Sequence, residues 1–441
     1  MPKRSRESSE EAAAMAGGED RLGALPDDAL LRVLSLLPSE DAVRTCVLAR
    51  RWRHLWRSTP ALRVARDDDR RWSVRWLRRF VSRFLRLRDG RVPLDECDLL
   101  CRPFVLCRGG AAAEASCFEA ADKWIRRAVS VGRARVLKLS VGTPENRFQL
   151  ADAPLVSQHL TRVELDNIEL QDGTLDLSGC PALEDLEIAS CSIEADQILL
   201  PSVKRLRIMW CYFNIIPRSS ISAPSLVSLQ LSENAGFTPL LESMPSLVTA
   251  FVRLDNQCSE ICANNNYFGD CGYDSCNGCY GNLFYEDDDN DRCVLLDGLS
   301  GATNLELIAL PEVFVCRKDF KWDPTFSKLK TLLLNEWCVA AGFSALIYFL
   351  QRSPILEKLT LQLHKAQEPA VVEANGCYNA REESLVSKHL KVVEIKYLED
   401  EVLHKLLMIL NTCGVPPEKV AIQKKNSWSS EKFSFEQKDV D

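Results

Sequence analysis

One short apolar pattern recurs along most of this 441-residue chain and constrains its fold more than any other feature. The pattern is LxxLxL, seen most clearly as LEDLEI at 183, VKRLRI at 203, LVSLQL at 226, LKTLLL at 329 and LEKLTL at 356. Successive copies begin at 134, 160, 183, 203, 226 and 247, so they lie 20 to 26 residues apart. In LEDLEI the apolar Leu186 and Ile188 alternate with Glu187, which predicts a strand with one apolar face. Because a single strand of this kind cannot bury that face, the spacing predicts stacked copies with a continuous core.

The period and the pattern resemble those of leucine-rich repeats. This resemblance implies an irregular solenoid whose parallel sheet lies on the concave face. In such repeats an Asn or Cys follows the strand, and here Cys191, Cys211 and Asn234 take that position. We interpret the two cysteines as buried structural thiols.

A second pattern, near the N-terminus, predicts three short helices in the stretch DRLGALPDDALLRVLSLLPSEDAVRTCVLARRWRHLWRSTPAL, residues 20–62. The first helix would bury one apolar face that ends before Pro38, and the third would carry Trp52, Leu55 and Trp56 at helical spacing. Three short helices cannot hide this many large apolar side chains. The module therefore either docks on the rest of the chain or presents a partner-binding face.

This stretch resembles the F-box, in the version found in a large plant family of F-box proteins with leucine-rich repeats. The resemblance rests on Leu25-Pro26, Leu30-Leu31, Leu37-Pro38, Asp41-Ala42-Val43 and the run from Arg50 to Trp52. It implies that the module binds the Skp-type adaptor of a cullin–RING ubiquitin ligase and, through it, the cullin and RING subunits. The side chains that would form or support the adaptor-binding face are Leu25, Pro26, Leu30, Leu31, Leu34, Leu37, Pro38, Val43, Val47, Leu48, Trp52 and Trp56.

An arginine-rich segment overlaps and follows this module. From Arg44 to Arg91 the chain has sixteen arginines and four aspartates, so with a net charge of −7 the remainder carries −19. A basic segment favours an acidic partner surface or nucleic acid, although a solvated helix face has the same composition. Aromatic residues at helical spacing and an overall pI near 5.5 argue against nucleic acid.

Two helices are predicted between the F-box and the repeats. Residues 76–88 would point Leu77, Phe80, Phe84 and Leu87 inward and their arginines outward. Residues 118–129 have one apolar face and would cap the repeat array.

A cysteine-rich stretch separates two repeats. The starts at Leu247 and Leu305 are 58 residues apart, and removing about 35 residues restores the repeat period. This predicts a loop insertion over 255–294. Its one CxxC pair, Cys276 and Cys279, has no histidine nearby, whereas structural zinc sites usually show two tight ligand pairs. We predict no metal site and no cofactor, with zinc binding as the alternative that metal analysis would test.

The patterns together predict an α+β protein in six parts. These are a disordered tail (1–19), the F-box (20–64), an Arg-rich helical linker with the N-terminal cap of the array (65–130), leucine-rich repeats (131–374), an FBD-like strand–helix–strand cap (375–425) and a flexible tail (426–441). The N-terminus has no apolar stretch typical of a secretory signal, and the longest apolar run is too short to span a bilayer. We therefore expect a nuclear or cytoplasmic location, no membrane contact and reduced cysteines.

No catalytic motif is present: the chain has no phosphate-binding loop, nucleophile elbow or HExxH helix. The family resemblance implies a non-catalytic substrate receptor of an SCF-type ligase, with an interaction scaffold that uses the F-box outside a ligase as the alternative. The target protein is not identified by the sequence. Strand alternation alone selects the candidate target contacts Glu187, Arg207, Gln230, Leu333 and Thr360.

Overall fold

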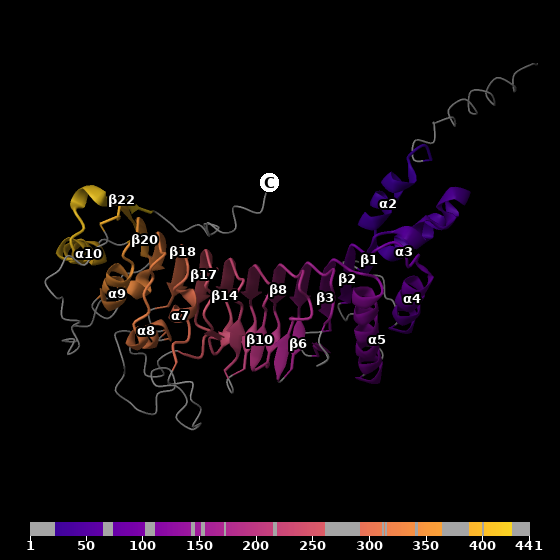
Figure 1. Cartoon of the computed structure of the whole chain (residues 1–441), viewed down its shortest axis with the longest axis horizontal. Helices are drawn as coiled ribbons and strands as arrows, with labels where there is room; N and C mark the ends of the chain where they lie inside the picture. Colours follow the sequence, from indigo (N-terminus) through magenta and orange to yellow (C-terminus); the bar gives the residue numbers. More distant parts are fainter. Residues whose placement is uncertain are drawn as a thin grey trace, which may run out of the picture.

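The computed structural model describes residues 23–64, 74–101, 111–142, 146–150, 155–171, 173–214, 218–260, 292–310, 313, 315–339, 343–363, 388–398 and 401–425. Its main feature is one 13-stranded, all-parallel sheet that runs the length of the array (Figure 1). In sheet order its strands are β1 (Ala61–Val64), β2 (Glu96–Cys101), β3 (Val136–Val141), β5 (Arg162–Asp166), β8 (Asp185–Ala189), β11 (Arg205–Met209), β14 (Ser228–Ser232), β17 (Thr249–Leu254), β18 (Asn304–Ala309), β19 (Thr331–Asn335), β20 (Lys358–Leu363), β21 (Val392–Tyr397) and β22 (Val420–Lys424).

The opposite side of the array consists of short strands in the middle and helices toward both ends. One sheet has the order β15-β12-β9-β6-β4 and the other the order β16-β13-β10-β7. These strands are β4 (Phe148–Leu150), β6 (Ile168–Leu170), β7 (Thr174–Asp176), β9 (Ser192–Ile193), β10 (Gln197–Leu199), β12 (Tyr212–Phe213), β13 (Ser220–Ser222), β15 (Ala235–Gly236) and β16 (Leu240–Leu241). The helices beyond the F-box are α4 (Val74–Leu87), α5 (Ala111–Ser130), α7 (Leu296–Leu299), α8 (Val315–Asp319), η6 (Phe320–Trp322), η7 (Glu336–Cys338), α9 (Ser344–Arg352), α10 (Glu401–Thr412) and η9 (Pro417–Lys419).

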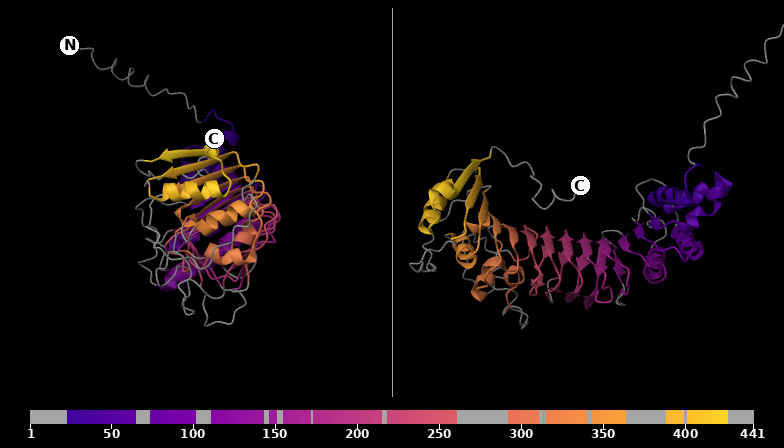
Figure 2. Two further views of the ribbon diagram at one scale, coloured as in Figure 1. Left: turned by 90° about the vertical axis from the view of Figure 1, so that its left-hand side faces the viewer. Right: turned by 45° about the horizontal axis from the view of Figure 1, so that its top comes forward.

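The two ends of the array rise on the same side, so the long sheet lines a concave face (Figure 2). This arrangement confirms the predicted leucine-rich-repeat solenoid with a parallel sheet on its concave side. None of the helices in the described ranges combines the length and the apolar character that a membrane crossing requires.

The repeat pattern produces this fold because equivalent residues lie level with one another in neighbouring strands. Leu186 is in register with Leu206 and Ile188 with Ile208, and all four side chains are buried. Between them, Glu187 points to the other face of the sheet. Each strand therefore buries alternate residues in the core and presents the rest on the concave face.

The residues that follow the strands support the backbone of the preceding repeat. The Asn234 amide nitrogen donates to the carbonyl oxygen of Ile208 at 3.2 Å, and its amide oxygen accepts the N–H of Cys211 at 2.9 Å. The thiols of Cys191 and Cys211 are buried, and each donates to a carbonyl oxygen in the strand of the preceding repeat. Burial, followed by the proximity of Cys211, raises the pKa of the Cys191 thiol. The interpretation of both cysteines as structural thiols is confirmed.

Helices α4 and α5 lie at the N-terminal end of the array, where α4 connects β1 to β2 and α5 connects β2 to β3. The sheet therefore begins at β1, before the predicted start of the array at 131, and the predicted helix 118–129 lies within the array instead of capping it. Leu77 and Phe84 of α4 are buried as predicted, but Leu87 is 40% exposed, so its predicted inward orientation is wrong. Leu87 is the last residue of α4 and therefore lies at the end of the helix, beyond the packed part of its apolar face. On α5, Trp124 is buried with the predicted apolar face. Its indole nitrogen donates to Ser82 Oγ at 3.1 Å, which ties the two helices together.

The cysteine-rich stretch leaves the sheet without interrupting it, because β17 and β18 pair directly across it. Both ends of the stretch contact the segment from Gly236 to Leu241: Cys258 forms a bridge with Gly236, and Leu241 N–H donates to Val294 O at 2.7 Å. The predictions for residues 261–291, which include Cys276 and Cys279, fall outside the described residues, as do the two predicted tails.

The C-terminal cap has the predicted strand–helix–strand order, β21, α10 and β22. Leu406 and Leu410 of α10 are buried against the array, and Gly414 follows the helix with a φ of +90°.

Candidate functional site

The N-terminal module is built from short helices that prolines separate. Helix α2 (Asp27–Leu36) starts after Pro26, and α3 (Ser39–Arg44) starts after Pro38, because proline favours extended backbone before a helix and lacks the N–H that a helix interior needs. The predicted second helix ends in a 3-10 turn, η1 (Thr45–Val47), and the predicted third helix is divided into two 3-10 turns, η2 (Arg50–Arg53) and η3 (Leu55–Ser58). Arg51 fixes the start of the module through two hydrogen bonds. Its guanidinium donates to Asp27 Oδ1 at 2.8 Å and to the carbonyl oxygen of Gly23 at 2.7 Å.

Four of the predicted adaptor-binding residues lie inside the protein. Leu30, Leu34 and Trp52 form a small core with Ala42, and Trp56 belongs to the core of the array, where its ring lies 5.6 Å from that of Phe84. These buried side chains support the module from inside and offer little contact surface. Of the other predicted residues, four are half-buried and two prolines are exposed: Leu25, Leu31, Leu37, Val43, Pro26 and Pro38.

The module nevertheless exposes large apolar side chains. Val47 and Leu48, both predicted, are 82% and 69% exposed, and Leu36 and Val33 on α2 are 70% and 43% exposed. Val33 and Leu36 were missed because the prediction followed the buried stripe of Leu30 and Leu34 along α2. Their spacing of three residues is the signal that could have found them, since it marks a second apolar stripe on the same helix. Exposed apolar side chains of this size on a small module are typical of a protein-interaction site.

The F-box module is joined to the array through a shared strand. Its last residues form β1, which pairs with β2 as the first strand of the long sheet. Arg63 of β1 donates from its backbone N–H to Ser39 Oγ at 2.9 Å and from Nε to the carbonyl oxygen of Ser35 at 2.8 Å, and its guanidinium pairs with Glu96. The helices of the module are thereby fixed relative to the concave face.

The five residues predicted to contact a target lie in one row across the concave face. Glu187, Arg207 and Gln230 occupy equivalent positions of neighbouring strands, and Leu333 and Thr360 do so farther along the sheet. The first four are half-buried, whereas Thr360 is only 7% exposed and offers little contact surface.

The half of the concave face nearest the F-box carries a chain of ion pairs. Lys138 lies 3.7 Å from Glu96 and 3.2 Å from Glu164, and Arg162 lies 2.7 Å from Glu164 and 3.7 Å from Glu187. These cross-strand pairs largely neutralise one another. Beyond Arg207 the row continues through Gln230, Phe251, Glu306 and Leu333, so charged side chains are fewer there.

The described residues also hold the two ends of the cysteine-rich stretch in place. Glu260 is fully buried and pairs with Arg218 at 3.1 Å, while the Asp319 carboxylate accepts the N–H groups of Val294, Leu295 and Leu296 at 2.7 to 2.9 Å. Burial raises the pKa of the Asp319 carboxyl, and the three N–H groups partly oppose this effect. Within the described part of the chain, no group of three His, Cys, Asp or Glu side chains is arranged to hold a metal ion.

Comparison with known proteins agrees with this architecture. Residues 22–63 match the family model described as the F-box domain. The chain is 28% identical to the MEIOTIC F-BOX protein MOF of Oryza sativa subsp. japonica, over 88% of this chain and 82% of that protein. Two F-box/FBD/LRR-repeat proteins of Arabidopsis thaliana, one of them named as putative, are 29% and 27% identical over 53% and 57% of this chain. The chain spans about three fifths of the length of these two relatives, 59% and 61%.

F-box domains in general bind Skp-type adaptors, and proteins of the F-box/leucine-rich-repeat class are generally non-catalytic. The match to the family model, the repeat array and the similarity over most of the sequence all point to one class. The chain therefore contains an F-box domain and has distant homology to the plant F-box/FBD/LRR-repeat proteins.

Proposed function

We propose that this protein is the substrate-recognition subunit of an SCF-type cullin–RING ubiquitin ligase. The observation that carries the proposal is the division of apolar residues in the F-box: Leu30, Leu34 and Trp52 fill its own core, while Val47 and Leu48 remain exposed. A module whose core is complete without these two side chains can offer them to an adaptor without unfolding. Apolar burial at such a face contributes about 1.5–3 kcal/mol for each large side chain.

In this proposal the concave face of the array holds the target protein. The shared strand β1 and the Arg63 contacts fix that face relative to the F-box, so a bound target would be held at a defined position in the ligase. The chain would contribute proximity and orientation, and the transfer of ubiquitin would take place on its partners. Glu187, Arg207, Gln230, Leu333 and Thr360 are the proposed target contacts, with Thr360 the smallest contributor.

Co-purification tests the first part of the proposal. The full-length chain should bring down a Skp-type adaptor together with a cullin, and a Val47→Asp, Leu48→Asp variant should lose both. Asp at Leu30 or Leu34 is less informative, because a buried charge would unfold the module. If the wild-type chain brings down no adaptor, the proposal is wrong. If it brings down adaptor without cullin, the protein is instead a scaffold that sequesters the adaptor.

A second comparison tests the target face. Proteins that co-purify with the wild-type chain should be lost from an Arg207→Glu, Gln230→Lys variant that still binds the adaptor. A genuine target should also increase in abundance when this protein is removed from cells. If the wild type and this variant bring down the same proteins in equal amounts, the concave row does not form the target-binding face.

A further inference from the structure

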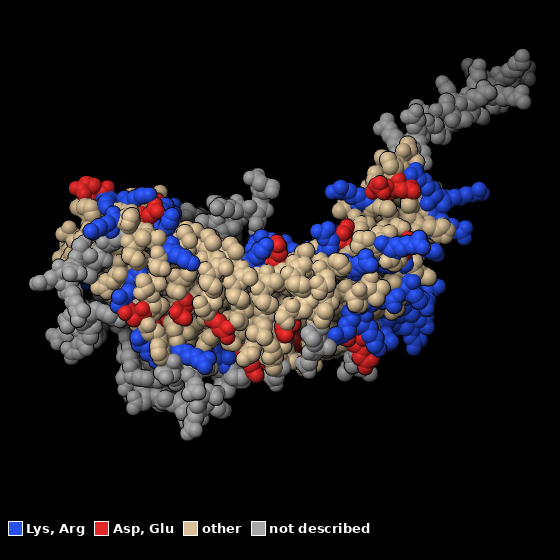
Figure 3. All heavy atoms as spheres, viewed as in Figure 1, with Lys and Arg blue, Asp and Glu red and all other residues tan. Residues whose placement is uncertain are grey.

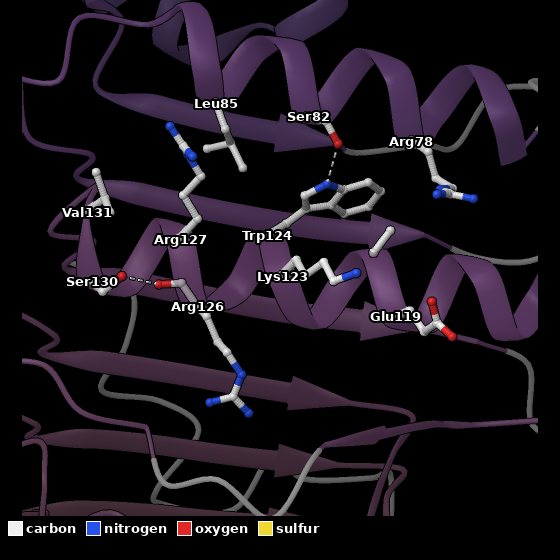
Figure 4. Close-up of a pocket in the computed structure, with 11 residues that line it drawn as sticks. Arg78, Ser82, Leu85, Glu119, Lys123, Trp124, Arg126, Arg127, Ser130 and Val131 are labelled. Atoms are coloured by element: carbon white, nitrogen blue, oxygen red, sulfur yellow. Dashed lines mark hydrogen bonds between the residues drawn. The ribbon is translucent and has the colours of Figure 1, made fainter.

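Helices α4 and α5 pack side by side next to the F-box and enclose a groove of about 450 Å³ (Figure 4). Arg78 and Leu85 of α4 line one wall, and Lys123 and Arg127 of α5 line the other. The ring of Trp124 lies at the base. A volume of this size is in the range of ligand-binding clefts, and it is enough for a few side chains of a bound peptide.

The groove has a strong excess of positive charge. Helix α4 contains five arginines and no acidic residue, and the surface over α4 and α5 forms a dense basic area in Figure 3. On α5, Arg126 pairs with Asp122 at 2.9 Å and turns away from α4, whereas Arg127 extends toward α4 (Figure 4). Among the described residues, neither Lys123 nor Arg127 has an ion-pair partner. The groove is lined by Arg78, Lys123 and Arg127, with Glu119 as the single carboxylate among its lining residues. Positive charge is therefore in excess, and a bound anion would offset the repulsion between the cations.

The details of the walls favour a polypeptide over a nucleic acid. The Trp124 ring is buried and its N–H is already bonded to Ser82, so it cannot serve as the stacking platform that single-stranded nucleic acids use. Leu85 lines the groove and Val131, at its end, is 57% exposed, so apolar contacts lie between the cations.

We propose that the α4–α5 groove is a second interaction site that binds an acidic polypeptide segment of a partner protein, in which carboxylates alternate with small apolar side chains. The carboxylates would pair with Lys123, Arg127 and Arg78, and the apolar side chains would cover Leu85 and Val131. This site lies apart from the exposed apolar residues of the F-box and from the concave row. The proposal therefore does not depend on adaptor or target binding.

Fluorescence polarisation with the full-length chain tests this site. The probe is a short labelled peptide in which glutamate alternates with alanine and leucine; the same peptide with lysine in place of glutamate and a labelled oligothymidine serve for comparison. We expect the glutamate peptide to bind, and to bind more weakly as salt is raised, because the contacts are exposed ion pairs. A Lys123→Glu, Arg127→Glu variant should bind at least about tenfold more weakly.

The matched control is a Lys405→Glu, Lys419→Glu variant, which makes the same change of net charge at the other end of the array. It should bind the peptide as the wild type does, and circular dichroism should show that both variants are folded. If both variants lose peptide binding to the same extent, the loss would follow from the change in net charge alone, and the proposal would be wrong. The proposal would also be wrong if the glutamate peptide did not bind at low salt. It would be wrong as well if the oligothymidine bound more tightly than the peptide and the groove variant abolished that binding.

Discussion

The buried ion pair between Arg218 and Glu260 closes the array at the point where the chain leaves it for the cysteine-rich stretch. Arg218 Nη2 donates to Glu260 Oε1 at 3.1 Å, and the other Glu260 oxygen accepts the N–H of Thr238 at 3.1 Å. Arg218 also donates to the carbonyl oxygen of Thr238 at 2.6 Å, and its guanidinium lies 5.1 Å from the centre of the Phe237 ring. An Arg218→Met variant keeps most of the apolar side chain but leaves a buried carboxylate without this guanidinium.

The expected effect depends on pH in a defined direction. Burial by itself raises the pKa of Glu260, but the charges of Arg218 and Lys318 and the hydrogen bonds from Arg218 and Thr238 hold that pKa below its ordinary value of 4.5. A carboxylate whose folded-state pKa is depressed contributes stability at neutral pH, and this contribution is lost as the pH falls through the folded-state pKa. In the variant, burial would instead raise the pKa, so the ionised carboxylate would destabilise the folded state at neutral pH.

We expect Arg218→Met to lower the free energy of unfolding by about 3–5 kcal/mol at neutral pH, which is typical when one partner of a buried pair is removed. Urea unfolding at neutral pH and near the ordinary glutamate pKa would measure this loss and its decrease as Glu260 becomes protonated. Lys204→Met is the matched control: the Lys204–Glu184 pair, at 2.7 Å, is half exposed, so its loss should cost about 1 kcal/mol or less. A similar small, pH-independent loss in Arg218→Met would refute the reasoning.

Three further changes test other parts of the fold. Asn335→Ala should lower the free energy of unfolding by about 1–3 kcal/mol in urea titrations, because the buried amide of Asn335 bonds both the N–H and the C=O of Ala309 at 3.0 and 2.9 Å. Gly236→Ala should destabilise by more than about 1 kcal/mol in the same assay, because Gly236 has a φ of +85° and an added Cβ would lie 2.0 Å from Phe213 O. Burial, with a smaller effect of the neighbouring Asp98, raises the pKa of Cys97 to about 12; mass spectrometry should therefore find Cys97 unmodified by iodoacetamide in the native protein at neutral pH and modified after unfolding.

The parts of the fold that could be predicted are those set by local periodicity. The alternation of Leu186, Glu187 and Ile188 identifies which residues enter the core, because a strand has only two faces and one of them is apolar. The same reasoning selected Glu187 and Arg207 as residues that point away from the core, and the structure places them in register on neighbouring strands.

Features that depend on contacts between distant residues could not be predicted in this way. Periodicity identifies an apolar face but not which element covers it. For this reason the sequence could not separate Leu30 and Leu34, which fill the module's own core, from residues on the surface of the predicted adaptor face. The short strand β1 has too few residues to show a pattern, so the join between F-box and array was not predicted. The Arg218–Glu260 pair joins residues 42 positions apart, and no local signal connects them.

We propose that the exposed apolar side chains of the F-box bind a Skp-type adaptor. Isothermal titration of the full-length chain with a purified plant adaptor tests it most directly, with Val47→Asp, Leu48→Asp as the test variant. The control is Met408→Asp, which alters an exposed apolar side chain on α10 at the far end of the array. We predict that the test variant binds at least about 100-fold more weakly, since two large apolar side chains contribute about 1.5–3 kcal/mol each, whereas the control binds as the wild type does. Adaptor binding that is equal in the wild type and the test variant would contradict the account.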